Sequence, residues 1–307
     1  MIEALFGGYW AAILTTASTL AIAAIGLQIT IRSGQFSVLQ AALIGLGGYA
    51  GGYGAVEFQW PFLATLAAGL LVGAVVGALA AALFSRVSGL LLGIATLAVG
   101  ELLVIAAYTY FPGGALGYVG IPIVVSAEIA AALLVTVIVV VGLAQRSQRN
   151  LALIASGGDP IAASAIGINV FQTRIWAFAF GGGLAGLAGA MNAQHVGLVI
   201  PESMGFAFEV VLIAFVIIGG LRTYWGAVLG AFSITVGQEF LRISTLDRFW
   251  MLGLLMTVVV LVRPNGVLNR KHLRVSSGHA ERGATGRLSL AGRLPVSRGS
   301  SKTGDAE

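Results

Sequence analysis

The sequence predicts an all-α polytopic membrane protein, a helix bundle of about 8–10 transmembrane helices. Of its 307 residues, 58% are hydrophobic and only 9% are charged, whereas a soluble domain carries about 25% charged residues. The mean hydropathy is +0.95. A hydrocarbon core of about 30 Å needs roughly 20 apolar residues per helix, so the chain is long enough for many crossings.

Nine segments are apolar enough to be candidate spans. They are residues 10–31, 36–56, 61–84, 89–110, 128–145, 171–192, 206–221, 224–241 and 249–262. The last four are short or rich in glycine. We expect residues 1–275 to form one transmembrane domain. Residues 276–307 are rich in Ser, Gly and Arg, and we expect them to form a disordered basic tail.

The arginines indicate the orientation of this domain. One set of alternate loops holds Arg32, Arg86, Arg146, Arg149, Arg174 and Arg222, and nine of the seventeen basic residues lie from Arg263 onward. The opposite loops hold only Arg242 and Arg248. Because basic loops stay in the cytoplasm, we expect the 145–173 loop and the C-terminus inside. The N-terminus is then outside, or inside if 36–56 is a broken element. The net charge of +5 thus belongs to a membrane-adjacent tail and does not indicate nucleic-acid binding.

No residue pattern of a catalytic, metal or nucleotide site is present, so we expect no catalytic residue, metal ion or cofactor. The chain has no cysteine and three separated histidines. Glu101 and Glu209 lie within predicted spans, and His195 and Glu239 lie near span ends. An acid inside a membrane is a candidate functional group, because burying it is unfavourable. It can equally be a hydrogen-bonding support between helices, and both interpretations stay open.

Small residues recur at helical spacing in two spans. Gly69, Gly73 and Gly77 repeat in the third span, and Gly182 and Gly186 repeat in the sixth. Helices in lipid associate through close van der Waals packing, which small residues allow. We therefore expect these glycines to lie at helix-packing interfaces.

Five separated stretches carry an ordered set of motifs. They are residues 34–49 (GQFSVLQAALIGLGGY), 95–101 (ATLAVGE), 161–169 (IAASAIGIN), a glycine-rich series from 185 to 231, and 263–268 (RPNGVL). Together they resemble the permease subunits of ABC importers for branched-chain amino acids (the LivH/LivM family), more closely the M-type. The sequence departs from the family pattern at Leu39, where a glycine is usual. Ile161 and Ser164 replace acids, which leaves only Asp159.

The resemblance implies a type II ABC importer-like permease, a transport subunit and not an enzyme. It would lie in the cell (inner or plasma) membrane of a bacterium or archaeon. Its implied partners are a second homologous permease, two cytoplasmic ABC ATPases, an extracytoplasmic solute-binding protein and the lipid bilayer.

The resemblance also makes the 145–173 loop a coupling loop for the ATPases. The coupling residues that it implies are Asp159, Ala162, Ala163, Ile166, Gly167, Ile168 and Asn169. Ala162 and Ala163 are small enough for a short helix to enter a groove of the partner. Gly167 can end that helix, and Ile166 or Ile168 offers an apolar anchor.

Polar side chains in spans tend to face the bundle interior, so they are candidates for a translocation pathway. These candidates are Gln40, Thr96, Glu101, Asn192 and Gln194. We expect Gln40 to line the wall of the pathway and Glu101 to give structural support. Three alternatives stay open: an ABC importer for urea or short amides, an ion-coupled secondary transporter that uses Glu101 or Glu209, and a non-transporting membrane scaffold.

Overall fold

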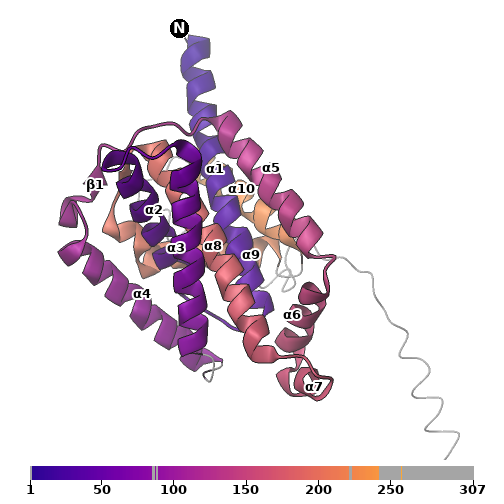
Figure 1. Cartoon of the computed structure of the whole chain (residues 1–307). Helices are drawn as coiled ribbons and strands as arrows, with labels where there is room; N and C mark the ends of the chain where they lie inside the picture. Colours follow the sequence, from indigo (N-terminus) through magenta and orange to yellow (C-terminus); the bar gives the residue numbers. More distant parts are fainter. Residues whose placement is uncertain (1, 85–86, 88, 221–222, 242–256, 258–307) are drawn as a thin grey trace, which may run out of the picture. The chain divides into compact units, whose positions relative to one another are not determined.

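Long apolar runs form helices in this chain because a backbone in lipid must satisfy its own N–H and C=O groups. The computed structural model describes residues 2–84, 87, 89–220, 223–241 and 257, all within the unit Met1–Asn269. Five helices are long and apolar enough to cross a membrane. They are α1 (Ile2–Arg32), α3 (Phe62–Leu83), α4 (Leu90–Tyr110), α5 (Ala127–Ala144) and α8 (Val170–Val196), shown in Figure 1. The predicted class, an all-α polytopic membrane protein, is confirmed.

Two of the predicted crossings form one broken element. Residues 206–221 and 224–241 become α9 (Phe206–Gly219) and α10 (Tyr224–Leu241), which meet at a bend of 119°. The 14 residues of α9 rise about 21 Å, less than the hydrocarbon core of about 30 Å. Gly220, with φ of +108°, ends α9. Gln28 of α1 donates hydrogen bonds to the carbonyls of Gly220 and Thr223 at the break, at 3.2 and 2.8 Å.

The described part of the chain therefore holds fewer helices of spanning length than the eight candidate spans predicted there. Five described helices are long and apolar enough to cross, or six spans result if α9 and α10 make one. α2 (Gln40–Val56) has 17 residues and begins later than the predicted span at 36–56, because residues 35–39 are not helical. Of the predicted span at 249–262 only residue 257 is described, and the predicted tail at 276–307 lies outside the described residues.

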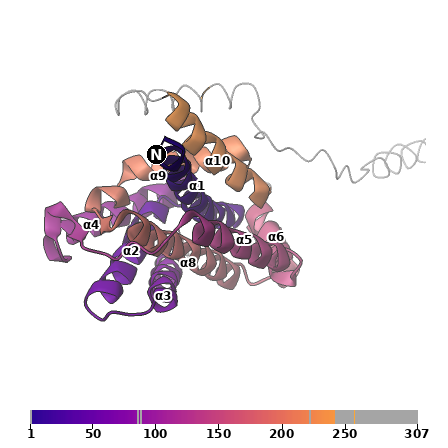
Figure 2. The same cartoon turned by 90° about the horizontal axis from the view of Figure 1, so that it is seen from above.

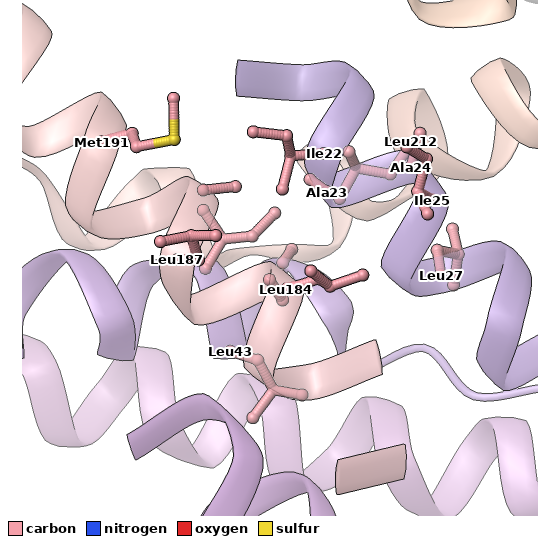
Figure 3. Close-up of a cluster of buried hydrophobic side chains, with 14 of the residues drawn as sticks. Ile22, Ala23, Ala24, Ile25, Leu27, Leu43, Leu184, Leu187, Met191 and Leu212 are labelled. Carbon is pink, nitrogen blue, oxygen red and sulfur yellow. The ribbon is translucent and has the colours of Figure 1, made fainter. Parts of the chain in front are cut away.

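The core forms where α8 packs among α1, α2 and α3 (Figure 2). Figure 3 shows apolar side chains of α1, α2, α8 and α9 that gather between these helices. The labelled residues are Ile22, Ala23, Ala24, Ile25, Leu27, Leu43, Leu184, Leu187, Met191 and Leu212. All of them are buried. Since α8 contacts three helices at once, its position determines theirs.

The two ends of this unit differ in structure. At one end β1 (Tyr118–Val119) pairs antiparallel with β2 (Leu198–Val199), next to the short 3₁₀ helices η1 (Gly114–Leu116) and η2 (Pro201–Met204). At the other end lie α6 (Gln148–Gly158) and α7 (Pro160–Ala165). Figure 1 shows α6 and α7 at the same end as the C-terminal end of α1.

Candidate functional site

The predicted coupling loop contains a short helix, α7, whose start is fixed by Asp159. The Asp159 Oδ1 accepts hydrogen bonds from the backbone N–H groups of Ile161 at 2.9 Å and Ala162 at 3.0 Å. The first N–H groups of a helix have no partner within the helix, and an aspartate at this position satisfies two of them. Pro160 follows at the first helical position, where its missing N–H has no cost.

The end of α7 is fixed by Gly167. Its φ of +86° is left-handed, a conformation that glycine adopts without steric cost. The Gly167 N–H donates to the Ser164 carbonyl at 3.0 Å and the Ile168 N–H donates to the Ala163 carbonyl at 3.1 Å. This pair of bonds is the Schellman motif. Asn169 then begins α8, its Oδ1 accepting from the Gln172 N–H at 3.0 Å.

These caps present apolar side chains to the outside of the chain. Ile161 and Ile166 are 80% and 76% exposed, and Ala162 is exposed beside them. Ala163 is only 2% exposed, so it packs against its own chain. Ile168 is half-buried. Of the two predicted apolar anchors, Ile166 and Ile168, Ile166 is therefore the more accessible. Ile161 is a second exposed apolar side chain on the same helix.

α6, which the sequence analysis did not separate from the loop, holds α7 against the membrane unit. A side chain at Gly157 would collide with the Arg32 carbonyl, because the end of α6 lies directly on the turn that follows α1. At the start of α6 the Arg149 guanidinium lies 4.6 Å from the centre of the Trp176 ring of α8, a cation–π contact. The loop is thus fixed to the unit at both ends of α6.

Two of the predicted pathway residues are buried and hydrogen-bonded within the chain. The Gln40 amide is 3% exposed and donates to the carbonyls of Ala23 at 3.3 Å and Gly181 at 3.1 Å. Thr96 is fully buried. Its hydroxyl accepts from the Val38 N–H at 3.0 Å and donates to the Leu92 carbonyl at 2.8 Å. In this conformation Gln40 joins α2 to α1 and α8, and Thr96 joins α4 to the segment before α2.

The other predicted pathway residues lie at two places. Gln194 is buried and donates from Nε2 to the Thr65 hydroxyl, which joins α8 to α3. Asn192 is half-buried in the same helix, α8. Glu101, near the middle of α4, is half-buried, and its Oε1 accepts from the Phe206 N–H at 3.1 Å. Glu101 therefore caps the start of α9.

Glu209, which lies within a predicted span, is 1% exposed. Its Oε2 accepts from the Ala41 N–H at 2.6 Å. This N–H is in the first turn of α2 and has no helical partner. Glu101 and Glu209 thus have the same role. Each carboxylate accepts a hydrogen bond from a backbone N–H at the start of another helix. The sequence marks both acids as unusual, but it does not show which amides they meet.

The predicted packing glycines lie where α3 and α8 cross. A Cβ on Gly69 would lie 2.6 Å from the Gly186 carbonyl oxygen, and a Cβ on Gly182 would lie 2.5 Å from that of Gly73. Gly77 lies against the Phe178 carbonyl in the same way. Both backbones therefore approach so closely that no side chain fits between them.

Known proteins similar to this chain are transport-system permeases. A family model described as the permease component of branched-chain amino acid transport systems matches residues 9–262. This chain is also similar to two curated proteins named high-affinity branched-chain amino acid transport system permease protein LivM. Over 125 residues it is 33% identical to LivM of Salmonella typhimurium and 32% identical to LivM of Escherichia coli. That stretch is 40% of this chain and 29% of each LivM.

A second group of relatives has a different name. The autoinducer 2 import system permease protein LsrC of Salmonella typhi is 32% identical over 102 residues, which is 31% of this chain and 29% of that protein. The matches thus span less than a third of the length of these curated relatives. No solved structure gives a significant match.

Proposed function

The chain belongs to the family of branched-chain amino acid transport permeases, and from that premise we propose that it is the membrane-spanning permease subunit of an ATP-driven ABC importer. It moves branched-chain or related amino acids into the cytoplasm. Partner ATPases dock on the loop that contains α6 and α7 and hydrolyse the ATP. This chain supplies no catalytic group of its own.

The observation that carries this proposal is the exposed apolar surface of α7. Ile161 and Ile166 are largely exposed on a helix whose start and end are both capped. Exposed apolar side chains on a capped helix favour a protein partner, because contact between apolar surface and water is unfavourable. Short helices that enter apolar grooves are a recurring recognition mode.

The orientation supports the same reading. α1 ends at Arg32 and α6 contains Arg149, and Figure 1 shows the C-terminal end of α1 at the same end as α6 and α7. Basic loops are retained in the cytoplasm, where ATP is available. We therefore place the coupling loop and the C-terminus inside, a second permease beside this one in the membrane, and a solute-binding protein at the end that carries β1 and β2.

The solute itself is proposed from the relatives. LivM names branched-chain amino acids and LsrC names autoinducer 2, so related permeases serve unlike solutes. The family model favours the first class. The ligand that copurifies with the binding protein of the same system tests this assignment: leucine, isoleucine or valine supports it, and urea or a short amide replaces it.

A pair of substitutions tests the docking surface. Ile166→Glu adds a charge to α7. Ile123→Glu adds the same charge before the N-terminus of α5, away from α7. The two side chains are similarly exposed, 76% for Ile166 and 70% for Ile123. We expect Ile166→Glu to lose co-purification of the ATPase in mild detergent, because a buried unpaired charge opposes the contact. Ile123→Glu should retain it.

If Ile166→Glu retains the ATPase as fully as Ile123→Glu does, α7 is not the docking element. If the unmodified chain copurifies with no ATPase and still transports solute, it is a secondary transporter. A membrane scaffold would show neither transport nor a response to substitutions in α7.

A further inference from the structure

Between α1 and α2 lies a segment that is not helical, residues 33–39, in which every residue except Gly34 and Phe36 is buried. We name it the buried link. Ser33, Gln35, Ser37 and Leu39 are each at most 4% exposed. Irregular backbone at membrane depth is tolerated where protein surrounds it. The buried residues of the link meet this condition, and its two ends contact different parts of the molecule.

The first end contacts α6 through a pair of glycines, Gly34 and Gly157. Gly34 has φ of +78°, and a Cβ placed on it would lie 2.9 Å from the Gly157 Cα at the end of α6. In the reverse direction, a Cβ on Gly157 would lie 3.1 Å from the Gly34 nitrogen. Backbone thus contacts backbone, without a side chain whose rotation could absorb a movement of α6.

The second end contacts two helices within the membrane unit. The Val38 N–H donates to the Thr96 hydroxyl of α4 at 3.0 Å. Just after the buried link, the Ala41 N–H of α2 donates to the Glu209 carboxyl of α9 at 2.6 Å. The start of α9 is in turn held by Glu101 of α4. A displacement of the buried link therefore reaches α2, α4 and α9 through hydrogen bonds and not through loose packing.

We propose that the buried link transmits movement of α6 to the helix starts of α2 and α9 and so couples ATPase docking to the membrane interior. Gly34 and Gly157 form its cytoplasmic contact, and Thr96 and Glu209 form its membrane contacts. This inference rests on the proposed function, because the movement originates in ATPases docked on α7. Coupling between separate sites can be carried by a continuous chain of packed groups and hydrogen bonds that has two discrete conformations.

Adjacent glycines provide a matched test. Gly157→Ala forces α6 away from the Arg32 carbonyl, whereas a Cβ on Gly158 meets nothing within 4 Å. Each variant is assembled with its partner permease and ATPases in lipid nanodiscs. ATP hydrolysis is then measured with and without the binding protein loaded with leucine. For Gly157→Ala we expect stimulation by the loaded binding protein to fall about threefold or more, as for a displaced coupling element, with ATPase co-purification and unstimulated hydrolysis retained. Gly158→Ala should behave as the unmodified chain.

The membrane end has its own test, which holds even if Gly157→Ala does not assemble. Thr96→Val removes the acceptor for the Val38 N–H, and Thr96→Ser restores it. Thr109 lies in the same helix and makes the same type of bond to its own helix, to the Ile105 carbonyl at 3.0 Å. Thr109→Val is therefore the control. We expect stimulation to be lost in Thr96→Val, restored in Thr96→Ser and unchanged in Thr109→Val. A role in stability alone would not separate stimulated from unstimulated hydrolysis.

The two proposals fail in different ways. Full stimulation in both Gly157→Ala and Thr96→Val would overturn the buried link and leave the ATPase docking intact. Absence of any ATPase on the unmodified chain would overturn the proposed function, and the buried link with it.

Discussion

The glycines between α3 and α8 matter as individual residues because each one replaces a side chain with a backbone contact. Gly73 lies against the Gly182 carbonyl, and Gly186 lies against that of Gly69. Without a hydrophobic drive between helices in lipid, such contacts contribute much of the association energy. Removing even one of them changes the separation of the two helices.

We predict that Gly73→Ala lowers the free energy of unfolding by about 1–3 kcal/mol, because the added methyl group overpacks the interface. Gly237→Ala in α10 is the control, since a Cβ there meets nothing within 4 Å. That control should keep or raise stability by up to about 1 kcal/mol, the usual gain of alanine in a helix. The thermal midpoint in one detergent measures both. A midpoint for Gly73→Ala at or above that of Gly237→Ala would contradict close packing.

At Gln40, a substitution can distinguish a role in stability from a role in lining the translocation pathway. Gln40→Leu removes two buried hydrogen bonds, to the Ala23 and Gly181 carbonyls, each worth about 0.5–1.5 kcal/mol. We expect a loss of about 1–3 kcal/mol in thermal unfolding, whereas Gln172→Leu at an exposed position changes little. Normal stability with altered uptake in Gln40→Leu would instead favour a wall of the pathway.

At the scale of elements, α7 depends on its caps. It has only six residues, too few to be stable alone, because forming the first turn of a helix is unfavourable. Asp159 at its start and the Schellman motif at Gly167 supply the missing bonds. The surface with Ile161 and Ile166 therefore exists in a fixed form before any partner arrives.

Asp159→Ala should loosen this element. Loss of an N-cap costs about 0.5–2 kcal/mol, so amide hydrogen exchange in residues 160–165 should accelerate and the ATPase should bind more weakly. Asp159→Asn keeps an acceptor oxygen and should retain slow exchange. Equal exchange in Asp159→Ala and the unmodified chain would show that other contacts hold α7.

Local signals in the sequence predicted the parts of this site that depend on neighbouring residues. Gly167 could be assigned to a helix end because a left-handed residue after a helix favours glycine. Distant contacts could not be predicted. Gly34 and Gly157 are far apart in the sequence, and nothing in either motif pairs them. Similarly, the acids at 101 and 209 were visible as unusual, but the amides that they cap belong to other helices.

At the scale of the whole molecule, composition predicted the class, but it predicted more helices of spanning length than the described part contains. Hydropathy identifies apolar segments but not their breaks, so α9 and α10 appeared as two spans although Gly220 ends the first and Gln28 satisfies the carbonyls at the break. The result is a unit in which α2 and α9 begin against other helices. Their starts are satisfied by Glu209 and Glu101.

The central claim is that this unit transports solute only when ATPases act on α7. The most direct measurement is uptake of labelled leucine into proteoliposomes that contain the assembled transporter, with the binding protein and ATP supplied on their respective sides. We predict uptake that requires ATP and is abolished by Ile166→Glu. Uptake that proceeds without ATP under a proton or sodium gradient, and is unchanged by Ile166→Glu, would contradict the claim.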